Sequence, residues 1–147
     1  MASKLVPYRL KNGVNSKVVY LLCEGDTTPF DDFIKECRDK TAIAKMAKAI
    51  ESIDEIGVQL SRQFNRLKPL KGGDASDLYE ITVKGCTARA YSFLIDGELA
   101  IAIAFFLPKT HQGQGKRIVN ASIERLSKKR KQLDEALKRR NEYGPEL

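Results

Sequence analysis

The sequence has few of the features that mark membrane or secreted proteins. Its longest uncharged apolar run, residues 99–108, is far shorter than the roughly 20 residues that a membrane-spanning helix needs. The N-terminal residues lack the apolar segment of a secretory signal, so we expect a cytoplasmic protein without a membrane partner. The three cysteines show no C-x-x-C spacing, which excludes a disulfide framework and a zinc pair and predicts reduced, packed thiols.

The residue patterns of several enzyme classes are also missing. The chain has one histidine, His111, and shows no Ser/His/Asp order, no metal-ligand spacing and no carboxylates paired for acid–base catalysis. Hydrolases of those classes are therefore not predicted, nor is a bound metal or cofactor. A length of 147 residues with 42% hydrophobic and 31% charged residues is instead typical of one globular domain with its own core.

Positive charge is concentrated near the C-terminus. The chain has 26 Lys and Arg against 19 Asp and Glu, a net charge of +7, and residues 107–147 carry 11 of the bases but only 5 of the acids. A clustered positive surface gains affinity for phosphates by releasing counterions, which favours a nucleic acid or another polyanion as partner. The alternative is the solvated face of an exposed helix, and charge alone leaves both possibilities open.

The N-terminal part of the sequence predicts an arm, a strand and a short helix. Residues 1–16 show no periodicity, so we expect a loop or a loosely held arm ahead of a single domain over residues 17–147. Residues 17–23 are apolar and β-branched and predict a strand. Thr28 and Pro29 then supply a helix N-cap and a proline in the first turn, which predicts a helix that ends near Arg38.

Two longer helices are predicted from spacing and composition. From Ile43 to Phe64, apolar residues recur at intervals of three and four and form one stripe along a helix. We expect this helix to lie on a sheet or on the preceding helix, although a coiled coil is the alternative. From Lys116 onward, a loose apolar stripe among many bases predicts a basic C-terminal helix.

Between these helices the sequence predicts a three-stranded meander. Residues 79–84 alternate polar and apolar side chains, and residues 88–95 and 98–106 flank Asp96-Gly97, a strong hairpin signal. With a two-residue turn, Phe93 would lie opposite Ala100, and Arg89 opposite Ala104. On the next pair of strands, Glu80 would lie opposite Tyr91, and Thr82 opposite Arg89.

This register places Glu80, Thr82, Arg89 and Tyr91 on one face of the sheet, beside a row of alanines. Such a face forms a shallow polar depression in which a ligand could sit. Alternatively, the C-terminal helix covers the face and Arg89 pairs with Glu80. In either case Arg89 needs a partner, a carboxylate or a phosphate, because an unpaired guanidinium within an apolar strand would be costly.

The order of elements and three segments of the meander and the following loop are distinctive. These segments are LYEITV (residues 78–83), RAYSF (residues 89–93) and AFFLPKT (residues 104–110), and a helix with Ala121 and Arg125 follows them. Over roughly residues 17–130 they resemble the phage-derived branch of the RelE/HigB-type toxins of bacterial toxin–antitoxin modules. The resemblance implies a RelE-like α+β fold: a small, mostly antiparallel sheet of one N-terminal strand plus the meander, two N-terminal helices and the basic C-terminal helix.

The resemblance also implies a function. Such toxins cleave mRNA on the ribosome without metal or cofactor, because the 2′-hydroxyl of the substrate attacks the neighbouring phosphate, and a cognate antitoxin binds them. Carried over by position, the catalytic residues would be Arg89 at the scissile phosphate and Lys109 and His111 beside it. The RNA-binding residues would be Lys84, Lys116 and Arg117 on adjoining phosphates and Tyr91 stacked on a base.

Two positions depart from the family pattern. Ile81 stands where many relatives have an arginine, and Pro108 stands where they have a lysine. His111 lies in a polar loop, where a surface role is the alternative to acid–base catalysis. Two further hypotheses therefore stay open: a toxin or regulator of the same fold that does not cut RNA, such as a ParE-like topoisomerase inhibitor, and a basic nucleic-acid-binding domain.

Overall fold

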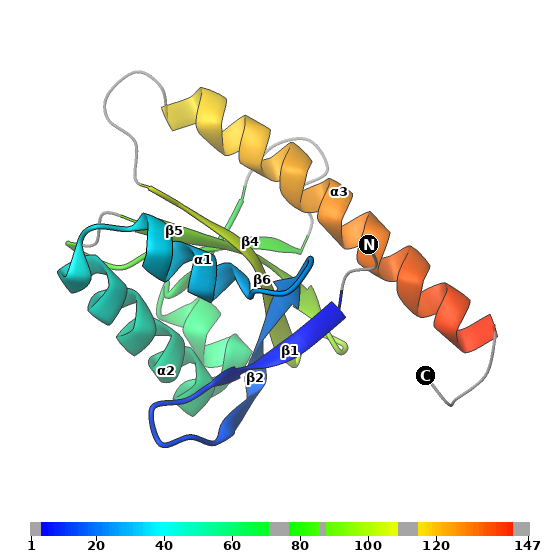
Figure 1. Ribbon diagram of the computed structural model, residues 1–147, viewed down its shortest axis with the longest axis horizontal. Coiled ribbons are helices and arrows are strands. Elements are labelled where there is room, and N and C mark those ends of the chain that lie inside the picture. The colour runs from blue at the N-terminus through cyan, green and yellow to red at the C-terminus, as the bar shows by residue number, and fades with distance from the viewer. Residues whose placement is uncertain (1–3, 71–76, 86–87, 109–114, 143–147) are drawn as a thin grey trace.

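The structure, a computed structural model, describes residues 4–70, 77–85, 88–108 and 115–142. Over these residues the chain forms a six-stranded mixed sheet in the order β1-β2-β6-β5-β4-β3 (Figure 1). Strands β2 and β6 are parallel, and the other neighbouring strands are antiparallel. The strands are β1 (Lys4–Arg9), β2 (Asn15–Cys23), β3 (Leu67–Pro69), β4 (Leu78–Ile81), β5 (Ala88–Ile95) and β6 (Ala100–Pro108).

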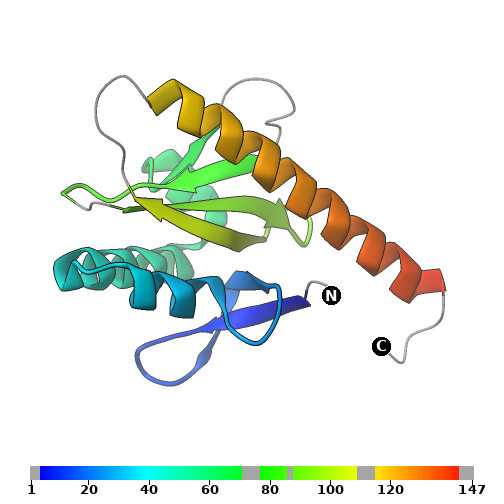
Figure 2. The same ribbon diagram turned by 45° about the horizontal axis from the view of Figure 1, so that its top comes forward.

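Three helices within the described ranges accompany the sheet: α1 (Pro29–Glu36), α2 (Lys40–Gln63) and α3 (Gly115–Glu142). They confirm the α+β class and the three helices that the sequence predicts. Figure 2 shows α3 on one side of the sheet and α1 and α2 on the other. The α2 face of the sheet buries Ala90, Ile101 and Ile103, and the α3 face packs against Ile123, Leu126 and Leu133.

Strand β1 lies in the segment for which the sequence predicts an arm or loop over residues 1–16. Val6 lies opposite Leu21, and Pro7 opposite Tyr20, in antiparallel pairing with β2. Pro7 has no N–H to donate to a ladder, and it is tolerated because β1 is an edge strand. The loop prediction is therefore wrong for Lys4–Arg9.

Helix α1 begins as predicted, at a capping box. The Asp31 amide donates to the Thr28 hydroxyl at 3.0 Å, and the Thr28 amide donates to the Asp31 carboxylate at 3.4 Å. Helix α2 lies on the sheet rather than in a coiled coil, because its stripe of Met46, Ile50 and Ile53 is fully buried in the core beneath the strands.

Gly57 interrupts α2. Its φ of 86° and ψ of 171° are far from helical values and open to glycine almost alone. Beyond it, Val58 and Ser61 are buried, whereas Leu60 and Phe64 are 42% and 63% exposed. The predicted stripe therefore fails after Gly57, because the kink rotates the last turns of the helix.

The β5–β6 hairpin differs from the predicted register. Ile95 lies opposite Ala100, so residues 96–99 form the turn instead of Asp96 and Gly97 alone. The Leu99 amide donates to the Asp96 carbonyl at 3.1 Å and closes this longer turn. A bulge after Tyr91 then brings Tyr91 opposite Phe105, and Arg89 lies opposite Leu107 rather than Ala104.

The cysteines agree with the prediction of reduced thiols where the structure describes them. Cys23 is buried, Cys37 is half-buried, and both are free. Cys86 lies outside the described residues. The pKa of the Cys23 thiol is raised by burial; Lys4 lowers it, and the carboxylates of Asp31 and Asp32 raise it further.

Candidate functional site

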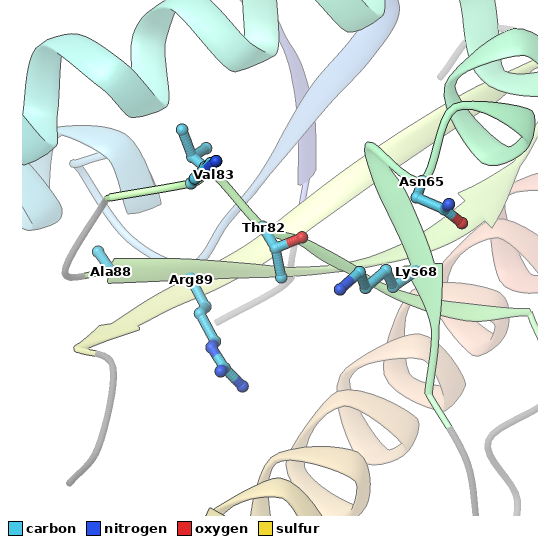
Figure 3. Close-up of a pocket in the computed structure, with 7 residues that line it drawn as sticks. Asn65, Lys68, Thr82, Val83, Ala88 and Arg89 are labelled. Atoms are coloured by element: carbon cyan, nitrogen blue, oxygen red, sulfur yellow. The ribbon is translucent and has the colours of Figure 1, made fainter.

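An open cavity of about 380 Å³ lies between the end of α2, strand β3 and the connection from β4 to β5 (Figure 3). It is referred to below as the Arg89 cavity. Among the described residues that line it, three side chains are cations and none is a carboxylate, which favours an anionic ligand. The lining residues are Asn65, Lys68, Thr82, Val83, Lys84, Ala88 and Arg89.

A Schellman motif ends α2 and turns the chain toward strand β3, which lines this cavity. Asn65 adopts a φ of 58°, a left-handed conformation that asparagine tolerates better than most residues. Its amide donates to the Arg62 carbonyl at 3.2 Å, and the Arg66 amide donates to the Ser61 carbonyl at 2.8 Å. Strand β3 begins two residues later, so this turn also sets the position of Lys68.

Lys68 belongs to a row of side chains that crosses the sheet. It lies opposite Glu80, Glu80 lies opposite Tyr91, and Tyr91 lies opposite Phe105. Residues in directly opposed positions share a face, which here is the face that α3 covers. The Glu80–Tyr91 pairing confirms the register that the sequence predicts for β4 and β5.

Arg89 forms an ion pair with Glu80, whose side chain is only 9% exposed. Arg89 Nε lies 3.1 Å from Glu80 Oε1, although the angle is not that of a hydrogen bond. The buried carboxylate needs this partner, since an isolated buried charge is costly. The Arg89 side chain is 32% exposed and lines the cavity, so the guanidinium that pairs with Glu80 can also meet an anion from solvent.

Lys68, Lys84 and Arg89 give the cavity its positive charge. Lys68 and Lys84 are exposed and form no ion pair with any carboxylate whose position the structure describes. Lys68 extends from β3 toward Thr82, and Arg89 extends from β5 (Figure 3). Three cations near one buried carboxylate leave a net positive charge that a phosphate would neutralise.

Tyr91 is not available to stack on a base. It is 2% exposed, and its ring stacks on Phe105 with centroids 5.2 Å apart, beneath α3. The pKa of its phenol is raised mainly by burial and also by the charge of Glu80, while Ser122 and Arg89 act in the opposite direction. The predicted stacking role is therefore not supported, because α3 packs on this face and closes it to solvent.

The structure brings together two of the other predicted site residues, Arg89 and Lys84, in the Arg89 cavity. Lys109 and His111 lie outside the described residues. Lys116 and Arg117 fall in the first turn of α3, where no side-chain positions are described. Their predicted roles stay predictions.

Lys68 and Asn65 line the cavity but are not predicted from the sequence. Lys68-Pro69 is typical of a helix end, which hides the short strand β3, and Asn65 lies in the turn just before this strand. The pair of leucines that flanks Lys68-Pro69 could have indicated a short strand, and both Leu67 and Leu70 are buried in the structure. A proline between them is compatible with an edge strand.

The α3 bases whose side chains the structure describes fall into two groups. Lys129 Nζ lies 2.6 Å from Glu24, Arg130 lies 3.3 Å from Asp77, and the Arg125 guanidinium lies 4.1 Å from the centre of the Phe105 ring. These three side chains tie the helix to the sheet side of the molecule. A second group is exposed: Lys128, Lys131 and Lys138.

Comparison with family models, curated proteins and solved structures gives no match to this chain. Within the described part of the chain, no helix is long and apolar enough to cross a membrane. The same residues contain no group of three or more His, Cys, Asp or Glu side chains that could hold a metal ion. The charge and geometry of the Arg89 cavity are therefore the features that point to a function.

Proposed function

We propose that the Arg89 cavity binds the phosphodiester backbone of RNA, and that the chain is a ribosome-dependent mRNA endonuclease of the RelE/HigB type, the toxin of a toxin–antitoxin module. The observation that carries the proposal is a cavity of about 380 Å³ whose described lining residues include three cations and no carboxylate. Lysine and arginine are the side chains that neutralise phosphates in most nucleic-acid interfaces. The cytoplasmic location and the antitoxin partner belong to this proposal.

Arg89 is placed before any ligand arrives. Its guanidinium is held by its position on strand β5 and by its ion pair with Glu80, while the exposed Lys68 and Lys84 add further positive charge beside it. Fixed positive charge stabilises a transition state more than mobile charge does, because no reorganisation is needed when negative charge develops. This arrangement suits a reaction in which the phosphate gains charge as it is attacked.

In the proposed reaction, a ribose 2′-oxygen attacks the adjacent phosphorus and the 5′-oxygen of the next nucleotide leaves. The products are a 2′,3′-cyclic phosphate and a 5′-hydroxyl. A base takes the proton of the 2′-hydroxyl, and an acid protonates the leaving oxygen. Arg89 and Lys68 would neutralise the non-bridging oxygens, and His111, which the resemblance places beside the phosphate together with Lys109, would act as general acid or base.

The departure from the family pattern at Ile81 has a structural explanation. Ile81 is fully buried in the core on the α2 side of the sheet, opposite Ala90. Its side chain does not line the Arg89 cavity, so an arginine at this position would not face the proposed substrate. Lys68, on the facing strand, supplies positive charge to the cavity instead.

A translation extract programmed with a defined message tests the proposal. Purified protein should produce cuts at fixed positions within codons, mapped by primer extension. Lys68→Ala and Lys84→Ala should each reduce cleavage, whereas Lys48→Ala, an exposed lysine of α2 outside the cavity, should cut like the unmodified protein. Uncut message at a saturating concentration of the protein would refute the proposed endonuclease activity.

The exposed group of α3 lysines favours a second candidate, a basic module that binds nucleic acid without cutting it. Lys128, Lys131 and Lys138 offer charge without sequence-reading groups. This candidate predicts binding to any duplex with a steep salt dependence. A gyrase supercoiling assay examines the ParE-like alternative, which would be discarded if supercoiling is unaffected.

A further inference from the structure

A second cavity, of about 330 Å³, lies on the β2–β6 side of the sheet and shares no lining residue with the Arg89 cavity. Helices α1 and α3, which lie on opposite sides of the sheet (Figure 2), both contribute residues to its lining. It is referred to below as the Glu36 cavity. Its lining residues are Leu22, Glu24, Thr27, Pro29, Asp32, Phe33, Glu36, Ala104, Phe105, Phe106, Leu107 and Arg125.

The floor of the Glu36 cavity is aromatic. Phe33 of α1 stacks on Phe106 of β6, with ring centroids 4.7 Å apart and planes 14° apart. Beside them, the Arg125 guanidinium lies 4.1 Å from the centre of the Phe105 ring. That contact shows that an aromatic ring of this cavity already receives a guanidinium, an interaction that strengthens where water is excluded.

The rim of the cavity is acidic, in a chain whose net charge is +7. Glu24 is paired with Lys129, and Asp32 accepts a hydrogen bond from Thr27 at 2.9 Å. Glu36 is exposed and has no ion pair with the side chains that the structure places. It is also the last residue of α1, where the helix dipole disfavours a negative charge, so helix stability does not account for it.

Strand β6 continues past its pairing with β2 and forms the base of this cavity. Strand β2 pairs with β6 at Ile101, Ala102 and Ile103, and residues 104–107 line the cavity. Ala104 and Phe105 are each 5% exposed, so this part of β6 is a buried floor and offers side-chain contacts to a ligand rather than a strand edge.

We propose that the Glu36 cavity binds a short peptide of a partner protein, which places an arginine or lysine side chain between the aromatic floor and the carboxylates of Asp32 and Glu36. The cavity volume lies near the lower limit for ligand sites and suits one or two side chains rather than a folded domain. Charge complementarity favours a basic side chain at this cavity, because the carboxylates of its rim attract a cation. The rest of the positively charged molecule repels a basic peptide, so binding elsewhere is disfavoured.

Amide NMR spectra of the 15N-labelled full chain, titrated with the peptide acetyl-Val-Arg-Val-amide, test the proposal. The amides of Asp32, Glu36 and residues 104–107 should shift. The same peptide with citrulline in place of arginine keeps the shape but loses the charge, and it should bind about tenfold more weakly. Equal affinity for the two peptides, shifts located elsewhere or no shifts at all would overturn the proposal.

The variant Glu36→Gln separates this site from general attraction. It should weaken binding of the arginine peptide by about tenfold and leave the citrulline peptide unchanged. The fold should tolerate it, because it removes an unfavourable charge from the end of α1. Glu55→Gln, an exposed acid of α2 outside the cavity, is the matched control and should bind like the unmodified chain. Equal weakening by both variants would mean non-specific attraction and would refute the site.

The RNA-binding proposal and the peptide-binding proposal can be refuted independently of each other. Lys68→Ala lies in the Arg89 cavity and should leave peptide binding unchanged, while Glu36→Gln should leave RNA cleavage unchanged. Loss of peptide binding in Lys68→Ala would contradict two separate sites.

Discussion

Arg89 Nε lies 3.1 Å from Glu80 Oε1, at the wall of a cavity that two lysines also line. This pair gives Arg89 two roles at once. It compensates a buried carboxylate, and it presents positive charge to the cavity. Replacing Arg89 alone therefore changes stability and ligand binding together, so a double variant is needed to separate the two effects.

Arg89→Ala should lower the free energy of unfolding by about 1 to 3 kcal/mol, because it removes the cation that lies against the buried Glu80 carboxylate. Arg89→Ala combined with Glu80→Gln should recover most of this loss, since the amide carries no charge. RNA cleavage should stay low in both variants. Urea unfolding and primer extension on the same preparations measure the two effects. Cleavage restored in the double variant would show that Arg89 acts only through stability.

Much of the fold could be predicted because local chemistry determines it. The capping box at Thr28 fixes the start of α1, and the alternation around Glu80 fixes its pairing with Tyr91. Strand β1 could not be predicted, because Pro7 argues against a strand until the edge position is known. The bulge after Tyr91 has no local signal, and it moves Phe105 to the α3 face.

The candidate site was predictable only in part, for a related reason. Arg89 is conspicuous as a charge within an apolar strand, so sequence alone indicates that it needs a partner. The choice of Glu80 as that partner follows from register, which the sequence also provides. Lys68 joins the site only through the three-residue strand β3, and a segment that short has no detectable periodicity.

Gly57→Ala should destabilise the protein by about 1 to 3 kcal/mol, because Gly57 adopts a conformation that side chains with a Cβ rarely reach. The space around Gly57 is open, so backbone strain is the sole cause of the loss. Chemical denaturation measures the change. At a regular helical position the same substitution is stabilising by about 0.4 to 1 kcal/mol, so a gain in stability would show that α2 is not kinked there.

Stability should fall at alkaline pH because of Tyr8. Burial, the larger cause, and the charge of Glu51 raise the pKa of the Tyr8 phenol from 10.0 to about 12. As the pH rises, the unfolded chain therefore releases the Tyr8 proton before the folded protein does. The stabilisation of the fold by Tyr8 is present below pH 10 and is lost as the pH rises to about 12. Tyr8→Phe should reduce the slope of unfolding free energy against pH in this range. An unchanged slope would contradict the burial of Tyr8.

Helix α3 should depend on its apolar contacts rather than on its ion pairs. Leu126 is fully buried against the sheet, so Leu126→Ala should cost about 2 to 5 kcal/mol. Lys129→Ala removes a contact of 2.6 Å to a partly exposed Glu24 and should cost less than about 1 kcal/mol. Thermal unfolding of the two variants compares them. A larger loss from Lys129→Ala would mean that charge holds the helix in place.

The salt dependence of binding to a short single-stranded RNA shows whether RNA occupies the Arg89 cavity. Each phosphate neutralised on a single strand contributes about 0.7 to the slope of log affinity against log salt concentration. Lys68→Ala and Lys84→Ala should each lower the magnitude of this slope by about 0.7, and Lys48→Ala should leave it unchanged. Slopes that match the unmodified protein in both cavity variants would show that RNA does not bind in the Arg89 cavity.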